Sequence, residues 1–529
     1  MENLKNIEIN PLKTSSSLGA VIVFLGIKNA VVLMHGSQGC ASFDKVTLTK
    51  HYRENIPVYT TALNELGAIL GGSSYLKAGV KNIADKINPA FIGVTSTGLS
   101  EVNGEDICAT FNELKKELKE SASYDGLNVA YVSTPDYDGN FEEGYKNAIL
   151  SLLQTFCIDD AEETADAEEG NNTNIAKIKY KEQNEEQNNE QNEEQNTVSN
   201  KDNGNSRANS LSCIAEAEKR CKTIDKNNIG NIRNISDYKS DDKNKNNGAN
   251  DIKNIRANVF CPFSFTAMDF LELRELLEDF GITPVMLPDL GTSMDGHLDE
   301  NGYLQTTSGG TDIEDLKKAG LNNLNIIIGN SLKSLIAPVK KITGLNTYYF
   351  SNVSGLKNTD LFFKFLEEIS LKNTPERYKR QKRQLMDAYL DTHFYFLGKN
   401  IAIAEGIDIL DSFSEVLCEV GANIKIGVTT SKAYENLKNR FEILAEGDID
   451  LFSELIKSDD DGIDLVISNS NAGYTAEKIG APILKVGFPL IDRIGHNFKH
   501  YILYKGSANL VYESANLLMS VKEKIMKEV

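Results

Sequence analysis

The chain's organisation is clearest in one stretch, Ala30-Val31-Val32-Leu33-Met34-His35-Gly36-Ser37-Gln38-Gly39-Cys40. Its first five residues are apolar without a break, which is typical of a strand buried on both faces. Gly36 ends that strand, and Gly36 and Gly39 both permit a close approach of the backbone to a bulky group. Because open parallel sheets bind ligands at the carboxyl ends of their strands, we expect Cys40 to lie at a ligand-binding edge.

A second strand and an intervening helix complete a parallel unit. Residues 91–94 form another apolar run, and between the two strands apolar side chains recur at helical spacing, at Leu76, Val80, Ile83 and Ile87. The order strand, helix, strand predicts a parallel βαβ unit whose connections cover the sheet.

The composition changes abruptly in the middle of the chain. From about Ile158 to Arg256 the sequence is rich in Asn, Glu, Gln, Lys and Asp. Too few apolar groups remain there to offset the entropy of the chain. We therefore expect a disordered insertion at 158–256, with one short helix around Cys213 to Cys221 whose thiols we interpret as surface groups.

Strands and helices alternate again after the insertion. Strands are predicted at 258–261, 282–287, 324–329, 400–404, 424–428, 464–468 and 482–486. Helices are predicted after Thr266 as far as Gly281, near Asp312, Ser331 and Thr359, and at 375–397, 408–420 and 507–527. The predicted fold is α/β, with three Rossmann-like domains at 1–157, 257–395 and 396–529, each a parallel sheet flanked by helices.

The composition disfavours several classes of protein. Lys and Arg number 56 against 76 Asp and Glu, a net charge of −20, which disfavours nucleic acid as a partner. No apolar run approaches the roughly 18 residues that span a bilayer, and the first residues lack a signal-peptide core. We therefore expect a cytoplasmic protein without a membrane partner.

The seven cysteines, at 40, 108, 157, 213, 221, 261 and 418, form no Cys-x-x-Cys pair. This spacing argues against a disulfide framework, a zinc ribbon and a self-contained ferredoxin-type site. Taken alone, Cys40 is either a metal ligand or a buried structural cysteine at a strand-to-helix turn.

Other polar clusters have structural interpretations. Asp289, Asp295 and His297 are expected in a solvated loop, and Glu105 with Asp106 at a helix start. The segment 308–311 is expected to open a helix. Arg493 and His496 receive no site role, and no set of acid, base and nucleophile stands out, so catalysis is left open and a non-catalytic role is expected.

Four stretches resemble the nitrogenase component 1 superfamily, in its β-type branch: residues 17–20, 35–40, 94–106 and 487–496. The resemblance extends from residue 11 to near the C-terminus and is broken only by the insertion. In the catalytic β subunits of this family three cysteines hold half of an eight-iron cluster. The resemblance places those three positions at Ser15, Cys40 and Gly98, so two of the three thiols are missing here.

That pattern resembles the subunits of the family that assemble the iron-molybdenum cofactor for nitrogen fixation. The resemblance implies a scaffold built with a NifE-type subunit as an α2β2 complex, which carries a cofactor precursor and a 4Fe-4S cluster with three thiolates from the partner and the fourth from Cys40. It also implies transient contacts with the nitrogenase Fe protein, the precursor donor and nitrogenase component 1. A single thiolate cannot hold such a cluster, so the chemistry of the ligands agrees with a cluster shared between two subunits.

Three alternatives stay open. In the first alternative, the chain is a nitrogenase β subunit with an altered cluster, in which the oxygen of Ser15 replaces a sulfur. In the second alternative, it is the β-type subunit of a dark-operative protochlorophyllide reductase or a related tetrapyrrole reductase, which shares the fold. The third alternative is a subunit that has lost its metal and only stabilises its partner.

Overall fold

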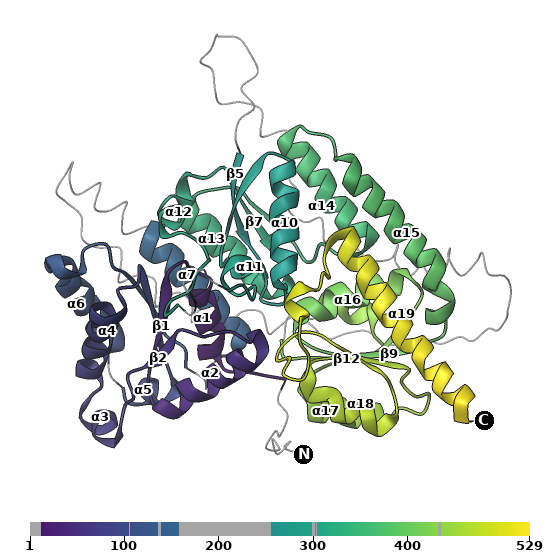
Figure 1. The fold of residues 1–529 in the computed structure, drawn as a ribbon, viewed down its shortest axis with the longest axis horizontal. Helices are drawn as coiled ribbons and strands as arrows, with labels where there is room; N and C mark the ends of the chain where they lie inside the picture. The colour runs from purple at the N-terminus through teal and green to yellow at the C-terminus, as the bar shows by residue number, and fades with distance from the viewer. Residues whose placement is uncertain are drawn as a thin grey trace, which may run out of the picture. The chain divides into compact units, whose positions relative to one another are not determined.

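The computed structural model describes residues 12–528, apart from 105, 136–138, 158–254, 299–301, 303 and 432–434. The expected insertion, but for its last two residues, and the expected helix at 213–221 lie outside the described residues. All described residues belong to one compact unit. It contains three sheets in which every strand pair is parallel, with helices packed beside them (Figure 1). The predicted α/β architecture is therefore confirmed.

The first sheet contains the strand with which the sequence analysis began. In spatial order its strands are β2 (Val58–Thr60), β1 (Ala30–His35), β3 (Phe91–Ser96) and β4 (Asn128–Val132). Its helices are α1 (Ser16–Leu25), α2 (Gln38–Tyr52), α3 (Glu65–Leu70), α4 (Ser73–Ile87), α5 (Gly98–Val102), α6 (Ile107–Glu120) and α7 (Phe141–Cys157). Every residue of β1 is buried because Val31 and Leu33 pack on one face, in the core that includes α4 and α6, and Val32 and Met34 on the other.

The second sheet follows the undescribed segment. In spatial order its strands are β6 (Ile282–Met286), β5 (Ile255–Phe260), β7 (Leu324–Ile328) and β8 (Thr347–Phe350). Its helices are α10 (Ala267–Asp279), α11 (Leu290–Ser293), α12 (Ile313–Lys317), α13 (Ile336–Thr343), α14 (Gly355–Ser370) and α15 (Glu376–Phe396). Thr266 caps α10 as predicted, in a capping box with Asp269.

The third sheet is the largest. In spatial order its strands are β11 (Ile443–Glu446), β10 (Asn423–Thr429), β9 (Asn400–Ala404), β12 (Leu465–Ser468) and β13 (Ile483–Lys485). Its helices are α16 (Ile407–Glu419), α17 (Ile449–Lys457), α18 (Gly473–Ile479) and α19 (Leu503–Glu528). Separate apolar clusters cover its two faces, one containing Ile401 and Ile403 and the other Ala402 and Ala404.

Several boundaries differ from the prediction. Helix α14 begins at Gly355 and α19 at Leu503, each four residues before the predicted start. The segment near Ser331 is a 3-10 helix, Asn330–Leu335, that leads into α13. Strand β5 begins at Ile255, two residues before the expected domain start at 257. The three domain ranges themselves remain a prediction, because the described residues form one compact unit.

Each sheet has a point at which its strand order reverses. The order β2-β1-β3-β4 reverses between β1 and β3, the order β6-β5-β7-β8 between β5 and β7, and the third order between β9 and β12. Loops leave adjacent strands in opposite directions there, which opens a crevice at their carboxyl ends. Ligand sites in such folds are therefore expected after β1, β5 and β9.

Candidate metal centre

Cys40 lies in the first turn of α2, five residues after the end of β1. Ser37 precedes the helix in an extended conformation, and its Oγ donates a hydrogen bond of 3.3 Å to the Cys40 Sγ. The cysteine side chain is exposed. The buried-cysteine interpretation is therefore wrong, and the thiol lies where the partial positive charge of the helix suits an anionic sulfur ligand.

Ser15 is connected to the same helix through side chains. Its Oγ caps α1 by accepting from the Leu18 backbone N–H at 3.2 Å. The Ser17 Oγ lies 3.2 Å from the Ser15 Oγ and 3.3 Å from Oδ2 of Asp44, which is four residues after Cys40 on α2. This polar chain links the first turn of α1 to α2.

Gly98 is the first residue of α5, directly after β3. The Thr97 and Ser100 hydroxyls both donate to the backbone oxygen of His35, at 3.3 and 2.7 Å. These bonds join the loop that follows β3 to the end of β1, where the strand order reverses. The structure thus brings the regions carrying Ser15, Cys40 and Gly98 to one edge of the first sheet.

The groups behind this edge are neutral or internally paired. His35 is buried, its Nδ1 lies 3.1 Å from the Thr61 Oγ1, and burial lowers its pKa to about 4 despite the nearby carboxylate of Glu101. That carboxylate accepts from the Ser133 hydroxyl at 2.6 Å and from Ser96. At neutral pH the His35 ring is uncharged, so it places no charge behind the loop that follows β1.

Apolar side chains are exposed on α2 after Cys40 and on α5 after Gly98. Phe43 and Val46 follow Cys40 on α2, and Leu99 and Val102 follow Gly98 on α5; the exposed fractions of Phe43 and Val102 are 75% and 73%. We call these four residues the apolar rim. Large apolar side chains exposed together typically mark a surface that another protein covers.

Oxygen-rich clusters do not provide a competing metal site. Within the described part of the chain, no group of three or more His, Cys, Asp or Glu side chains is arranged to hold a metal ion. Asp289 is buried and forms an ion pair of 2.6 Å with Arg274, so its expected place in a solvated loop is wrong. The Asp295 Oδ1 instead pairs with the Nδ1 of His297 at 2.5 Å.

The remaining candidates lie outside this edge. Asp106 caps α6 through the Ala109 N–H at 2.8 Å, as predicted, whereas Glu105 lies outside the described residues. Thr311 forms an isolated bridge with Ile27, so 308–311 do not open a helix directly. Arg493 is exposed. The ring of the half-buried His496 is tilted against that of His51, with ring centroids 4.3 Å apart.

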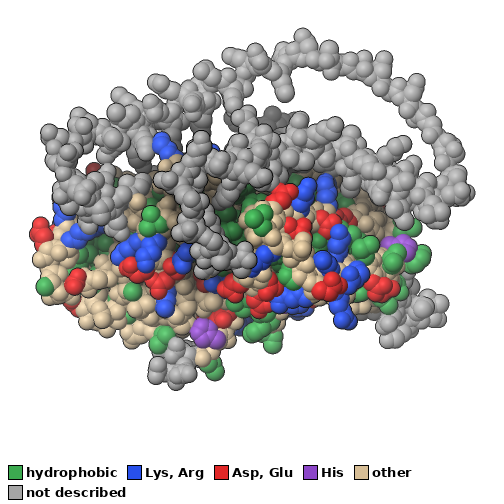
Figure 2. Space-filling model, turned by 90° about the horizontal axis from the view of Figure 1, so that it is seen from above, with side chains coloured by type: hydrophobic (Ala, Val, Ile, Leu, Met, Phe, Trp, Pro, Cys, Tyr) green, Lys and Arg blue, Asp and Glu red, His purple; other side chains and the backbone are tan. Residues whose placement is uncertain are grey.

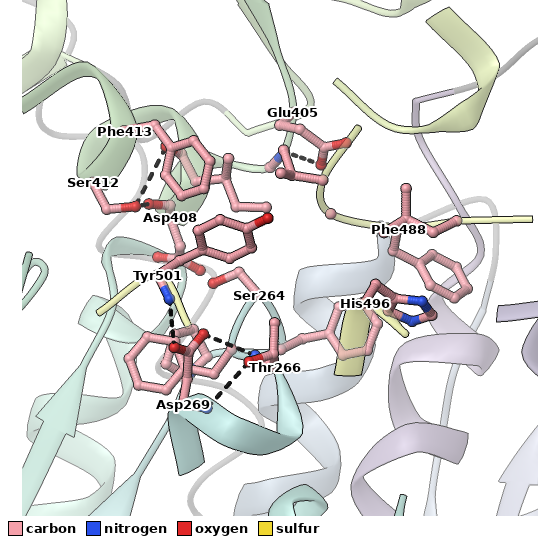
Figure 3. Close-up of a pocket in the computed structure, with 18 of the residues that line it drawn as sticks. Ser264, Thr266, Asp269, Glu405, Asp408, Ser412, Phe413, Phe488, His496 and Tyr501 are labelled. Atoms are coloured by element: carbon pink, nitrogen blue, oxygen red, sulfur yellow. Dashed lines mark hydrogen bonds between the residues drawn. The ribbon is translucent and has the colours of Figure 1, made fainter. Parts of the chain in front are cut away.

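Sequence reasoning missed a cavity of about 550 Å³ lined by helix and loop residues beside the first sheet and by residues of the second and third sheets and their loops. Figure 3 labels ten of its lining residues, among them Asp269, Glu405, Phe488 and His496. The available signal was Glu405, an acid directly after the apolar strand 400–404. The acid's position after a buried parallel strand matches the rule used to select Cys40.

A family profile described as "Nitrogenase component 1 type Oxidoreductase" matches residues 15–519. The chain belongs to this family. The family resemblance seen in the sequence is therefore confirmed, and the match spans all three sheets.

Two relatives and one solved structure are similar to this chain along nearly its whole length. The chain is 31% identical to the nitrogenase iron-molybdenum cofactor biosynthesis protein NifN of Sinorhizobium fredii, covering 98% of this chain and 94% of that protein. It is 29% identical to NifN of a Nostoc species, covering 99% and 96%. A solved structure titled "Nitrogenase Cp1 at pH 6.5" matches with a TM-score of 0.75 at 25% identity, covering 100% and 96% of the two chains.

Two further observations concern membrane-spanning helices and the distribution of surface charge. None of the helices in the described ranges is long and apolar enough to cross a membrane. On the face shown in Figure 2, Lys and Arg side chains are interspersed with Asp and Glu. That mixed distribution does not provide the basic stripe typical of proteins that bind nucleic acid.

Proposed function

We propose that the chain is the NifN-type subunit of a scaffold on which the nitrogenase iron-molybdenum cofactor is assembled. It pairs with a NifE-type subunit, and two such pairs form an α2β2 complex in the cytoplasm. Cys40 supplies one thiolate to a 4Fe-4S cluster at the subunit interface, and the partner supplies three. The complex receives a precursor from its donor, matures it with the nitrogenase Fe protein and passes it to nitrogenase component 1.

The exposed thiol of Cys40 at the strand-reversal point carries this proposal. A cubane cluster requires four ligands, usually thiolates. Ser15 and Gly98, the two other positions that the resemblance assigns to cluster ligands, lie in segments hydrogen-bonded to α2 or β1 but carry no sulfur. A cluster held at Cys40 therefore needs thiolates from another chain, and the exposure of Cys40 leaves room for them.

The apolar rim supports an interface at the same place. Phe43 is three residues after Cys40 on α2, so the two side chains are neighbours on one helical face. Burying Phe43 against a partner removes apolar surface from water and simultaneously shields the cluster. Cluster binding and subunit association should consequently stabilise each other.

Replacing Cys40 tests the proposal directly. The chain is coexpressed with a NifE-type partner, and the complex is purified without oxygen as wild type, Cys40→Ala and Cys108→Ala. Cys108 is a matched control, because it is also an exposed cysteine and lies on α6 beside the same sheet. Iron per complex and the EPR spectrum of the reduced cluster are then measured.

We expect Cys40→Ala to lose or alter the cluster signal and to lower the iron content, while Cys108→Ala retains both. A Cys40→Ala complex with wild-type iron and an unchanged spectrum would contradict the assigned ligand. Loss of iron in both variants would show a general loss of integrity and would also contradict a specific role for Cys40. The ability of each complex to activate cofactor-free nitrogenase component 1 then tests the assembly role separately.

A further inference from the structure

The cavity of about 550 Å³ lies at the strand-reversal points of the second and third sheets. The segment 262–267 after β5 and Gly329 after β7 line it from the second sheet, and Glu405 and Gly406 after β9 from the third. The residues around it thus come from two of the positions at which open parallel sheets bind ligands. Nothing in the proposed cluster chemistry uses this cavity.

Glu405 presents an unpaired oxygen there. Its side chain is only 4% exposed, its Oε2 accepts from the Gly406 N–H at 3.2 Å, and its Oε1 makes no hydrogen bond, although the side chain and backbone N–H of Asn469 face the carboxyl group and favour its ionised form. A side-chain Cβ at Gly487, where φ is +73°, would lie 2.4 Å from the carboxyl carbon. Glycine at that position therefore leaves room for the buried acid, whose pKa is raised by burial to about 8.

Three phenylalanines from different parts of the chain form an aromatic wall of the same cavity. Phe141 and Phe263 have ring centroids 4.6 Å apart, and Phe263 and Phe488 5.2 Å apart. Aromatic faces attract cations through their quadrupole, most strongly where water is excluded. We use the name aromatic wall for these three rings.

Two further acids of the cavity, Asp269 and Asp408, already have donors. Asp269 accepts from the backbone N–H groups of Tyr501 and Thr266, at 2.8 and 3.1 Å, and Asp408 from the hydroxyl of Ser331 at 2.5 Å (Figure 3 shows both acids). Burial raises the pKa of each acid to about 6. An anionic ligand would face these acids directly, so the lining disfavours it.

The basic groups of the lining do not offset this. Lys485 is paired with Asp492 and Lys499 with Glu513, while Lys13 and Arg493 are exposed. His496 has no partner for either ring nitrogen, and burial lowers its pKa to about 4, so the ring is neutral at pH 7. The buried lining is therefore acidic and aromatic.

We propose that this cavity binds a small organic cation, a primary amine whose ammonium group donates to the Glu405 Oε1 and whose hydrocarbon tail packs against the aromatic wall. The ammonium supplies the donor that the orphan oxygen lacks. The tail covers apolar surface, and the cation meets the ring faces. Anionic iron-sulfur precursors and polycarboxylates do not share this site.

Three probes with the same hydrocarbon tail separate the contributions. Pentylamine, pentan-1-ol and pentanoate are titrated into the full-length protein by calorimetry at about pH 9, where Glu405 is ionised and pentylamine still carries its proton, with wild type, Glu405→Gln, Phe488→Leu and Glu446→Gln. Glu446 is the matched control, because it is an exposed acid on β11 of the same sheet. Near-UV circular dichroism confirms that each variant is folded.

We expect wild type to bind pentylamine on the order of millimolar and more tightly than the alcohol or the carboxylate. Glu405→Gln weakens amine binding about tenfold, as expected for loss of a charged hydrogen bond, and Glu446→Gln has no effect. Phe488→Leu weakens the amine more than the alcohol and provides a second test if Glu405→Gln fails to fold. Equal binding of amine and alcohol, preferred binding of pentanoate, no amine binding, or an amine affinity unchanged in both cavity variants would overturn the proposal.

Discussion

A Cβ added to Gly36 would lie 2.0 Å from the Oγ1 of Thr97 and 2.8 Å from its Cβ. This close approach joins the turn before Cys40 to the turn before Gly98. The turns leave adjacent parallel strands, paired in register from Ala30 with Phe91 to His35 with Ser96. The position of Cys40 relative to α5 therefore depends on the absence of a side chain at Gly36.

Gly36→Ala should destabilise the first sheet and impair cluster binding. Overpacking of this kind typically costs about 1–3 kcal/mol. Urea unfolding of the purified chain and iron content of the coexpressed complex measure the two effects. Adding Thr97→Gly removes the obstructing side chain and should restore part of both; a double variant no better than Gly36→Ala would show that the contact is not the cause.

Ser15→Ala should lower stability without changing the iron content. The variant removes the N-cap of α1, a loss that typically costs about 1 kcal/mol. Asp106→Ala, which removes the cap of α6 beside the same sheet, is the control for the cost of a lost cap. Iron that falls in Ser15→Ala but not in Asp106→Ala would instead identify the Ser15 oxygen as a ligand, and would favour a nitrogenase β subunit with an altered cluster.

Phe43→Asp should weaken association with the NifE-type partner. A buried aromatic residue at an interface often contributes more than 1 kcal/mol, so the dissociation constant should rise about tenfold. Leu321→Asp is the control, because Leu321 is 83% exposed and lies in the 3-10 helix Ala319–Leu321, just before β7 of the second sheet. Calorimetry or quantitative copurification gives the affinities, and equal weakening by both substitutions would argue against an interface at the apolar rim.

The pH dependence of stability should change in Glu405→Gln. Burial raises the pKa of Glu405 from 4.5 to about 8 in the folded protein, so between these values the folded state retains a proton that the unfolded state releases. The free energy of unfolding therefore falls as pH rises through this window, by at most about 1.4 kcal/mol per pH unit from this group, and levels off above it. Glutamine removes this contribution.

Urea unfolding of wild type and Glu405→Gln measures this contribution. The unfolding free energies are compared at several pH values between about 5.5 and about 9, a range that covers most of the window. The stability of the variant relative to wild type should increase with pH up to about 8 and then stay constant. Contributions from His51 and His496, whose pKa values are lowered by burial, act in the opposite direction below pH 6.5 but cancel in the difference. A pH-independent difference would refute the buried, protonated state of Glu405.

Apolar strands buried on both faces were predictable from the sequence, and so was the short β13, but three other short or half-exposed strands were not. β1, β3 and β9 are apolar runs buried on both faces, so their composition alone identifies them. β2 has three residues, β8 is only half-buried and β11 has exposed ends, so each lacks the continuous burial that makes a strand visible. Their pairing with a neighbouring strand, absent from the local sequence, determines them.

The two candidate sites differ in the same way. Cys40 could be placed at a sheet edge because its strand, turn and helix are consecutive in the sequence. The aromatic wall could not be predicted, because Phe141, Phe263 and Phe488 are separated by more than a hundred residues and meet only in the folded chain. Burial of Asp289 was missed for the same reason, since its partner Arg274 is on α10.

The exposure of Cys40 has a consequence for the chain before it meets a partner. An accessible thiol can be oxidised to sulfenic acid and then irreversibly to higher acids, and each product destroys a sulfur ligand. A subunit made in excess, or in the presence of oxygen, would accumulate damage at the thiol that we propose as its cluster ligand. Matched synthesis of the two subunits would therefore protect this thiol from oxidation. The fraction of chains whose thiol resists alkylating reagents would then report the fraction bound to a partner.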